Sequence, residues 1–207
     1  MASVLETSEF RGVTRIVLSE GESLRVCARH FRAAPLAPGD EVDREAYVQR
    51  VARLQQADAY EAALRSLDVC ARTRRELSRS LAAKGYLAPA IEATLERLAR
   101  CGLIDDGRYA RHAVEGMSDR AVGVYAARRK LRAKGIGEAD VEAALEVFDE
   151  KQQRAAARAA AAQLARRYEG LPAREAKAKL SQALARRGFA WDVVGDALEA
   201  LFADEWD

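Results

Sequence analysis

Clusters of lysine and arginine are the residues of this sequence whose type and spacing best suit a chemical role, the binding of an anionic partner. The densest cluster, from residue 128 to residue 134, places five bases within seven positions. Guanidinium and ammonium groups at this density can neutralise nucleic-acid phosphates or dock on an acidic protein surface. Two further clusters, near residues 75 and 180, share this character. The candidate contact residues are Arg72, Arg74, Arg75, Arg79, Arg128, Arg129, Lys130, Arg132, Lys134, Lys177, Lys179, Arg186 and Arg187.

Residues that could support catalysis are not arranged for it. The sequence contains none of the patterns GxxxxGK[ST], GxSxG and HExxH. The pair Asp105 and Asp106 follows Gly102 and precedes a helical pattern, which favours helix capping over acid–base chemistry. His112 has no partner within sequence range, so we expect a surface or half-buried histidine. The sequence therefore predicts a protein that is not an enzyme.

The cysteines indicate neither disulfides nor a metal site. Cys27, Cys70 and Cys101 form no CxxC pair, and only two histidines accompany them. We expect all three to be small apolar core residues, and we expect no cofactor and no metal. No apolar run approaches the roughly 18 residues of a transmembrane helix, and the first residues do not resemble a signal peptide. These features predict a cytoplasmic protein without a membrane partner.

The aromatic residues are predicted to serve packing. The residues expected to pack include Tyr109, Tyr125, Tyr168, Trp191 and Trp206. For Tyr125 there is an alternative, because it lies beside the densest basic cluster and an exposed ring there could stack on bases.

The elements that must position the bases are mostly helices. The chain holds 44 alanines in 207 residues, and from about residue 43 onward the pattern is helical to the end. The first 43 residues differ. Thr14–Leu18 and Ser23–Ala28 favour strands and predict a hairpin, and Ala34–Asp40 predicts a linker. Because two strands alone are marginal in water, the hairpin must pack against the rest of the chain.

A threefold internal repeat organises the helical part. Each copy has leucine, two variable positions, a base, glycine and a large apolar residue, with glycines at Gly85, Gly135 and Gly188. An aliphatic residue follows six positions after each glycine, and a leucine ten positions after it. The pattern predicts a helix that ends at a left-handed glycine cap, followed by a second helix.

Each predicted helix pair is preceded by another helix, at about 44–70, 106–117 and 151–168. The fold class is therefore mainly α, with three tandem three-helix repeats forming an elongated curved array and a small N-terminal β-hairpin. We divide the chain into a hairpin region and linker, 1–43, and repeats at 44–105, 106–150 and 151–207.

The net charge of +2 is a cancellation between segments of opposite sign. Residues 72–134 and 151–190 each carry +8, residues 135–150 and 191–207 each carry −6, and residues 1–71 carry −2. One explanation is that exposed faces must carry charge and that oppositely charged neighbouring helices attract. The other is a functional basic surface, which better explains why the signs separate by helix and why the separation recurs.

Several stretches resemble the RecX family of RecA regulatory proteins. They are 73–77 through 84–86, 98–110 and 123–136, and the most specific is Gly-Leu-Ile-Asp-Asp-Gly-Arg-Tyr-Ala at 102–110. The resemblance covers about residues 60–202. The sequence departs from the family pattern at Leu103, where an aromatic residue is usual, at Lys130, where an acid is common, and at 124–126, which lack Pro-Arg-Arg.

The resemblance implies a non-enzymatic protein that binds the RecA filament on single-stranded DNA and dampens ATP hydrolysis and strand exchange. The basic residues above would then form the contact surface, and we expect a monomer. Two other classes fit the residues alone. A stand-alone nucleic-acid-binding helical protein predicts affinity for bare DNA, whereas an inert helical scaffold predicts neither interaction.

Overall fold

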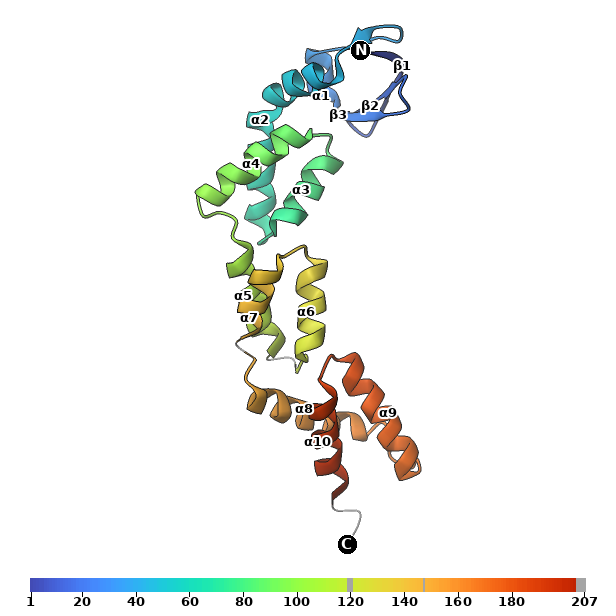
Figure 1. The fold of residues 1–207 in the computed structure, drawn as a ribbon, viewed down its shortest axis with the longest axis vertical. Helices are drawn as coiled ribbons and strands as arrows, with labels where there is room; N and C mark the ends of the chain where they lie inside the picture. The colour runs from blue at the N-terminus through green and yellow to red at the C-terminus, as the bar shows by residue number, and fades with distance from the viewer. Residues whose placement is uncertain (119–120, 147, 204–207) are drawn as a thin grey trace. The chain divides into compact units, whose positions relative to one another are not determined.

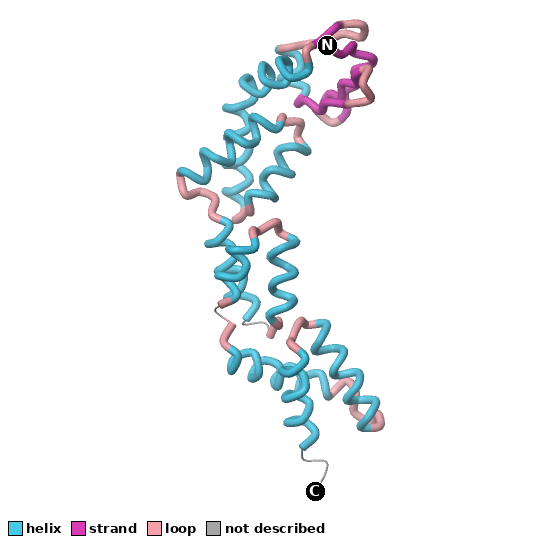
Figure 2. The backbone as a smooth tube through the Cα atoms, viewed as in Figure 1, coloured by secondary structure: helices cyan, strands magenta, loops and turns pink. Residues whose placement is uncertain are grey.

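The computed structural model describes residues 1–118, 121–146 and 148–203. The chain divides into two compact units, Met1–Asp105 and Asp106–Asp207. Strands occur only at the N-terminal end of the described chain, and helices make up most of the rest (Figures 1 and 2). The predicted class, mainly helical with a small N-terminal strand region, is confirmed.

The predicted hairpin exists as part of a larger sheet. Strands β2 (Val13–Leu18) and β3 (Ser23–Cys27) pair antiparallel, with Ile16 opposite Leu24. The sequence analysis missed β1 (Ala2–Phe10), which pairs with β2, and the short β4 (Glu41–Val42), which pairs with the start of β1. The strand order is β3-β2-β1-β4. Most of β1 is exposed, so its sequence need not alternate between apolar and polar residues, and that alternation is the signal by which a strand is recognised.

The sheet packs against helices, as the weakness of an isolated hairpin requires. Its buried face carries Ile16, Leu18 and Val26, which join one hydrophobic cluster with residues of α2 (Arg44–Val69) and with Leu87. After β3 the chain forms a short helix, α1 (Ala28–Ala33), which overlaps the predicted strand only at Ala28 and otherwise covers residues for which the sequence predicted no element. The hydroxyl of Tyr47 donates to the carbonyl of Ala34 at 2.9 Å, and burial raises its pKa to about 12, so it stays a donor.

The first repeat consists of α2, α3 (Arg74–Ala83) and α4 (Ala88–Arg100), around a core that includes Leu77, Leu81 and Leu95. The sequence Thr73-Arg74-Arg75-Glu76 has the capping-box pattern, which predicts a helix start at this point, and the capping box is present at the start of α3. The Thr73 hydroxyl accepts from the Glu76 backbone N–H at 3.2 Å, and the Glu76 carboxylate accepts from the Thr73 N–H at 3.1 Å. The local sequence thus fixes where α3 begins.

The repeated glycines end their helices as predicted. Gly85, Gly135 and Gly188 have φ of +82°, +83° and +85°. The residue after Gly85 donates its N–H to the Leu81 carbonyl at 3.2 Å, and Gly85 itself donates to Ala82 at 3.0 Å. This pair of bonds is a Schellman motif, and its 6→1 bond recurs after the other two glycines.

The second unit holds the other two repeats. Helices α5 (Asp106–Ser118), α6 (Val124–Ala133) and α7 (Glu138–Leu145) surround one apolar core. Helices α8 (Glu150–Ala165), α9 (Ala173–Arg186) and α10 (Trp191–Phe202) surround another. The alanine-rich α8 buries Ala157, Ala160 and Ala161 in that core, so small residues there let neighbouring helices approach.

A buried glutamine ties the first glycine turn to α2. The side chain of Gln55 is fully buried, its Nε2 donates to the Gly85 carbonyl at 2.9 Å, and its Oε1 accepts from the Leu87 N–H at 2.7 Å. Because Gln55→Ala leaves this N–H buried without a partner and opens a cavity, we expect it to lower the free energy of unfolding by about 2–4 kcal/mol. Urea unfolding measures the change. The neighbouring exposed Gln56, changed to alanine, should alter stability by less than about 0.5 kcal/mol, and equal effects would contradict this role.

Candidate interaction surface

The structure places the three basic clusters on the second helices of the repeats or at the ends of those helices. Arg72 precedes α3, and Lys134 and Arg187 are the C-cap residues of α6 and α9. The remaining residues lie within the helices: Arg74, Arg75 and Arg79 on α3; Arg128, Arg129, Lys130 and Arg132 on α6; Lys177, Lys179 and Arg186 on α9.

On α6, two of the bases face the acidic helix that follows. The Arg128 guanidinium donates to both carboxylate oxygens of Glu142 on α7, at 2.9 Å and 2.7 Å. Arg132 likewise donates to both oxygens of Glu138, with Nε at 2.8 Å from Oε2, and this hydrogen bonding lowers the pKa of Glu138. Attraction between oppositely charged neighbouring helices therefore accounts for Arg128 and Arg132.

The other α6 bases remain directed to solvent. Arg129 and Lys130 are exposed, and neither forms an ion pair with any residue that the structure describes. Tyr125 lies one turn before Arg129 on the same helix, and 54% of its surface is exposed. The expectation that Tyr125 serves packing is thus wrong, because it occupies the outer face of α6 and not the face that carries Ala127 and Leu131 into the core.

The first repeat shows the same division between paired and solvent-directed bases. Arg74 forms an ion pair with Glu92 on α4. Arg75 and Arg79 are exposed, with no ion pair recorded in the described part of the chain. The Nε of Arg72 is buried and makes no hydrogen bond to any described residue, which distinguishes Arg72 from an open surface base.

The accepting glutamates and the solvent-directed arginines occur at equivalent repeat positions, although the arginines that pair with the glutamates do not. Glu92 and Glu142 both stand seven residues after their glycine, and each accepts from an arginine of the preceding helix. Arg79 and Arg129 both stand six residues before their glycine, and both are exposed. The first two repeats thus share an exposed arginine six positions before the glycine. They also share a glutamate seven positions after the glycine, which pairs with an arginine of the preceding helix.

The third repeat distributes its charges differently. Its acidic last helix pairs with the first helix, through an ion pair between Arg154 on α8 and Asp196 on α10, and among the described residues it forms no ion pair with the middle helix. On α9, Lys179 is 2.7 Å from Glu175, while Lys177 and Arg186 are exposed. The position equivalent to Arg79 and Arg129 holds Gln182, so this repeat lacks the recurring arginine.

Backbone hydrogen bonds join the start of α6 in the second repeat to the end of α9 in the third. The N–H of Gly123 donates to the Arg187 carbonyl at 2.9 Å, and the N–H of Tyr125 donates to the Gly188 carbonyl at 3.0 Å. The N–H of Val124 donates to Oε1 of Gln153, a largely buried side chain of α8, at 3.2 Å. The open N–H groups at the start of α6 are thus satisfied by the next repeat.

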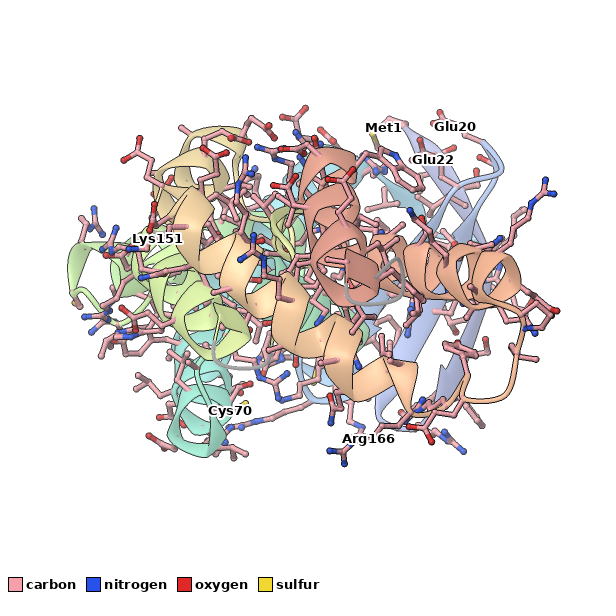
Figure 3. All side chains as sticks on the ribbon, turned by 90° about the horizontal axis from the view of Figure 1, so that it is seen from below. Met1, Glu20, Glu22, Cys70, Lys151 and Arg166 are labelled. Atoms are coloured by element: carbon pink, nitrogen blue, oxygen red, sulfur yellow. The ribbon has the colours of Figure 1, made fainter. Side chains whose placement is uncertain are left out.

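Several further expectations from the sequence need correction. Cys70, which Figure 3 labels, and Cys101 are exposed and not core residues, and only Cys27 is partly buried. Trp191 is 70% exposed, so it does not serve packing either, whereas Tyr109 and Tyr168 do pack against apolar clusters. Trp206 lies outside the described residues. Cys70 and Cys101 are the C-cap residues of α2 and α4, where the chain leaves the helix, whereas for Trp191 residue type and spacing do not show which helix face a neighbour covers.

His112 is exposed, as expected, and its Nδ1 lies 3.3 Å from a carboxylate oxygen of Glu115. Among the described residues, no three histidines, cysteines or carboxylates gather as a metal site would require. Within those same ranges, no helix combines the length and apolar character needed to cross a bilayer.

Comparisons with known proteins place this helical array in a family. Family models for the first and third three-helix domains of RecX match residues 59–98 and 150–198. The protein "Regulatory protein RecX" of Halorhodospira halophila is 36% identical over 148 residues, which span 71% of this chain and 89% of that protein. This chain belongs to the RecX family.

Two other comparisons agree with membership of the RecX family. The protein of the same name from Levilactobacillus brevis is 35% identical over 167 residues, covering 80% of this chain and 63% of that protein. A solved structure titled "Crystal structure of regulatory protein RecX" matches with a TM-score of 0.67 and 28% identity, over 99% of this chain and all of the other. RecX proteins are named as regulatory proteins, and the resemblance first identified from the repeats is thus confirmed.

Proposed function

We propose that this RecX-family chain binds the RecA recombinase filament on single-stranded DNA and inhibits its ATPase and strand-exchange activity. The contact surface consists of the solvent-directed bases of α3, α6 and α9, presented by repeats at 44–105, 106–150 and 151–207. The chain acts as a monomer in this proposal, with no cofactor.

The observation that carries the proposal is the recurrence of a solvent-directed arginine at one repeat position. Arg79 and Arg129 are exposed, while neighbouring arginines pair with Glu92 and Glu142. If the bases served only to stabilise adjacent helices, we would expect each of them to pair with an acid on a neighbouring helix. Open cations that recur along the sequence in two repeats instead suit a partner with repeated negative charge, such as a nucleoprotein filament.

The decisive experiment is a RecA ATPase assay on single-stranded DNA, titrated with this protein. We expect hydrolysis to fall at substoichiometric to equimolar levels of the protein. Unchanged hydrolysis up to equimolar levels, with the protein folded by circular dichroism, would count against the proposal.

A second candidate function is direct binding of nucleic acid without RecA. The exposed ring of Tyr125 beside Arg129 favours it, because an aromatic face with an adjacent guanidinium can stack on a base and neutralise its phosphate. Affinities for bare and RecA-coated single-stranded DNA at physiological salt discriminate the two. Comparable affinities would favour the independent DNA binder, and a clear preference for coated DNA would favour the filament regulator.

Salt dependence should report how many phosphates the surface neutralises. If Arg129 contacts a phosphate, log affinity for the coated strand should fall against log salt, and the slope should be smaller by about 0.7 in Arg129→Gln. Fluorescence anisotropy from about 50 to 300 mM salt measures it. A flat response in the wild-type protein would indicate a protein-only interface.

A further inference from the structure

A hollow of about 430 Å³ lies between α2 and α4, and none of the basic-cluster residues discussed above lines it. Two matching stripes line it. On α2, Arg53, Ala57 and Tyr60 are spaced i, i+4 and i+7, and on α4 the residues Ala93, Arg97 and Arg100 have the same spacing. Each stripe therefore lies on one helix face. The two alanines leave space between the helices, and the longer side chains surround it.

The only charged residues that line the hollow are positive. Arginines come from both helices, and no aspartate or glutamate is among the lining residues. Arg53, Arg97 and Arg100 are exposed, and none forms an ion pair with a described residue, whereas Arg65 on the same α2 helix pairs with Glu61. Three guanidinium groups thus face one space without a compensating acid in its lining.

One of these arginines is held in place by an aromatic ring. The guanidinium carbon of Arg97 lies 3.9 Å from the centre of the Tyr60 ring, a cation–π contact that fixes the plane of the guanidinium and leaves its N–H edges available. The neutral side chains of Gln56 and Thr94 also line the hollow and add possible donors.

Helix-end electrostatics explain only part of this arrangement. Arg97 and Arg100 lie in the last turn of α4, where any base is favoured by the helix dipole. This does not account for Arg53, which lies in the middle of α2. Nor does it account for the two small residues, Ala57 and Ala93, that leave space between the helices. The convergence of both helices on one hollow needs a further reason.

We propose that this arginine hollow binds a phosphate group. At neutral pH a phosphate monoester carries about −1.5 to −2 charges and three strong acceptor oxygens, which matches three converging guanidinium groups better than the single charge of one carboxylate. The volume lies in the range of small-ligand sites, which is compatible with a mononucleotide. The phosphate comes either from a free nucleotide or from the phosphorylated end of a nucleic-acid strand.

Calorimetric titration of the isolated full-length protein tests the site with three probes: inorganic phosphate, ADP and a short 5′-phosphorylated oligodeoxynucleotide compared with its 5′-hydroxyl form. We expect phosphate-bearing probes to bind and Arg97→Gln or Arg53→Gln to weaken them about tenfold or more, because each removes a charge-assisted hydrogen bond. Tighter binding of ADP would identify a nucleotide site. A preference for the phosphorylated over the hydroxyl strand would identify a strand-end site.

The matched control is Arg65→Gln, on the same helix but paired with Glu61 outside the hollow, and it should leave phosphate binding unchanged. Equal weakening by Arg65→Gln, absence of binding by all probes, or tighter binding of a glutamate-rich peptide than of phosphate would overturn the proposal. Because RecA is absent from this assay, its result is independent of filament regulation. The double variant Arg129→Glu with Lys130→Glu should bind ADP as the wild-type protein does.

Discussion

Replacing Gly188 with alanine should destabilise the Asp106–Asp207 unit by about 3 kcal/mol or more and lower its melting temperature on the order of 10 °C. Two costs add. Gly188 has φ of +85°, where an L-residue costs about 1–2 kcal/mol. An added Cβ would also lie 2.8 Å from the Cα of Ala126 and closer still to its backbone nitrogen, so the two repeats would have to separate.

The control for this prediction is Gly170→Ala. Gly170 has φ of +87°, yet no atom lies within 4 Å of a Cβ added there. It therefore carries the conformational cost alone, about 1–2 kcal/mol. Thermal unfolding followed by circular dichroism compares the two variants. Equal losses of stability in the two variants would show that the close approach of Gly188 to α6 adds nothing to the cost of the alanine substitution.

Reversing the charge of Arg129 and Lys130 together should raise the concentration needed for half-maximal inhibition of RecA by tenfold or more. The double variant Arg129→Glu with Lys130→Glu changes the local charge by four units at exposed side chains that form no ion pair within the described chain. The fold should be unaffected, because neither side chain is in the core. The RecA ATPase assay on single-stranded DNA gives the comparison.

The matched control neutralises a pair on the same helix. Arg128→Gln with Glu142→Gln removes both members of the bidentate ion pair and leaves the net charge unchanged. We expect inhibition close to that of the wild-type protein, because this arginine already has a partner within its own repeat. Full inhibition by the folded charge-reversal variant would remove Arg129 and Lys130 from the mechanism.

Local sequence was a reliable guide wherever a motif carries its own hydrogen bonds. The Schellman turns at Gly85, Gly135 and Gly188 and the capping box at Thr73 formed where predicted, because each is completed within six or so residues of chain. The N-terminal region was less predictable. β1 is long but mostly exposed, so its pairing with β2 depends on contacts that no alternation of residues reveals.

The sequence by itself determined the repeats, the helices and the places where bases concentrate, because periodicity, caps and charge are properties of short segments. Only the tertiary structure decided which bases have partners. Arg128 and Arg129 are adjacent and chemically identical, yet one faces Glu142 and the other faces solvent. The difference arises because successive helical residues point about 100° apart, and a neighbouring helix covers only one of those directions.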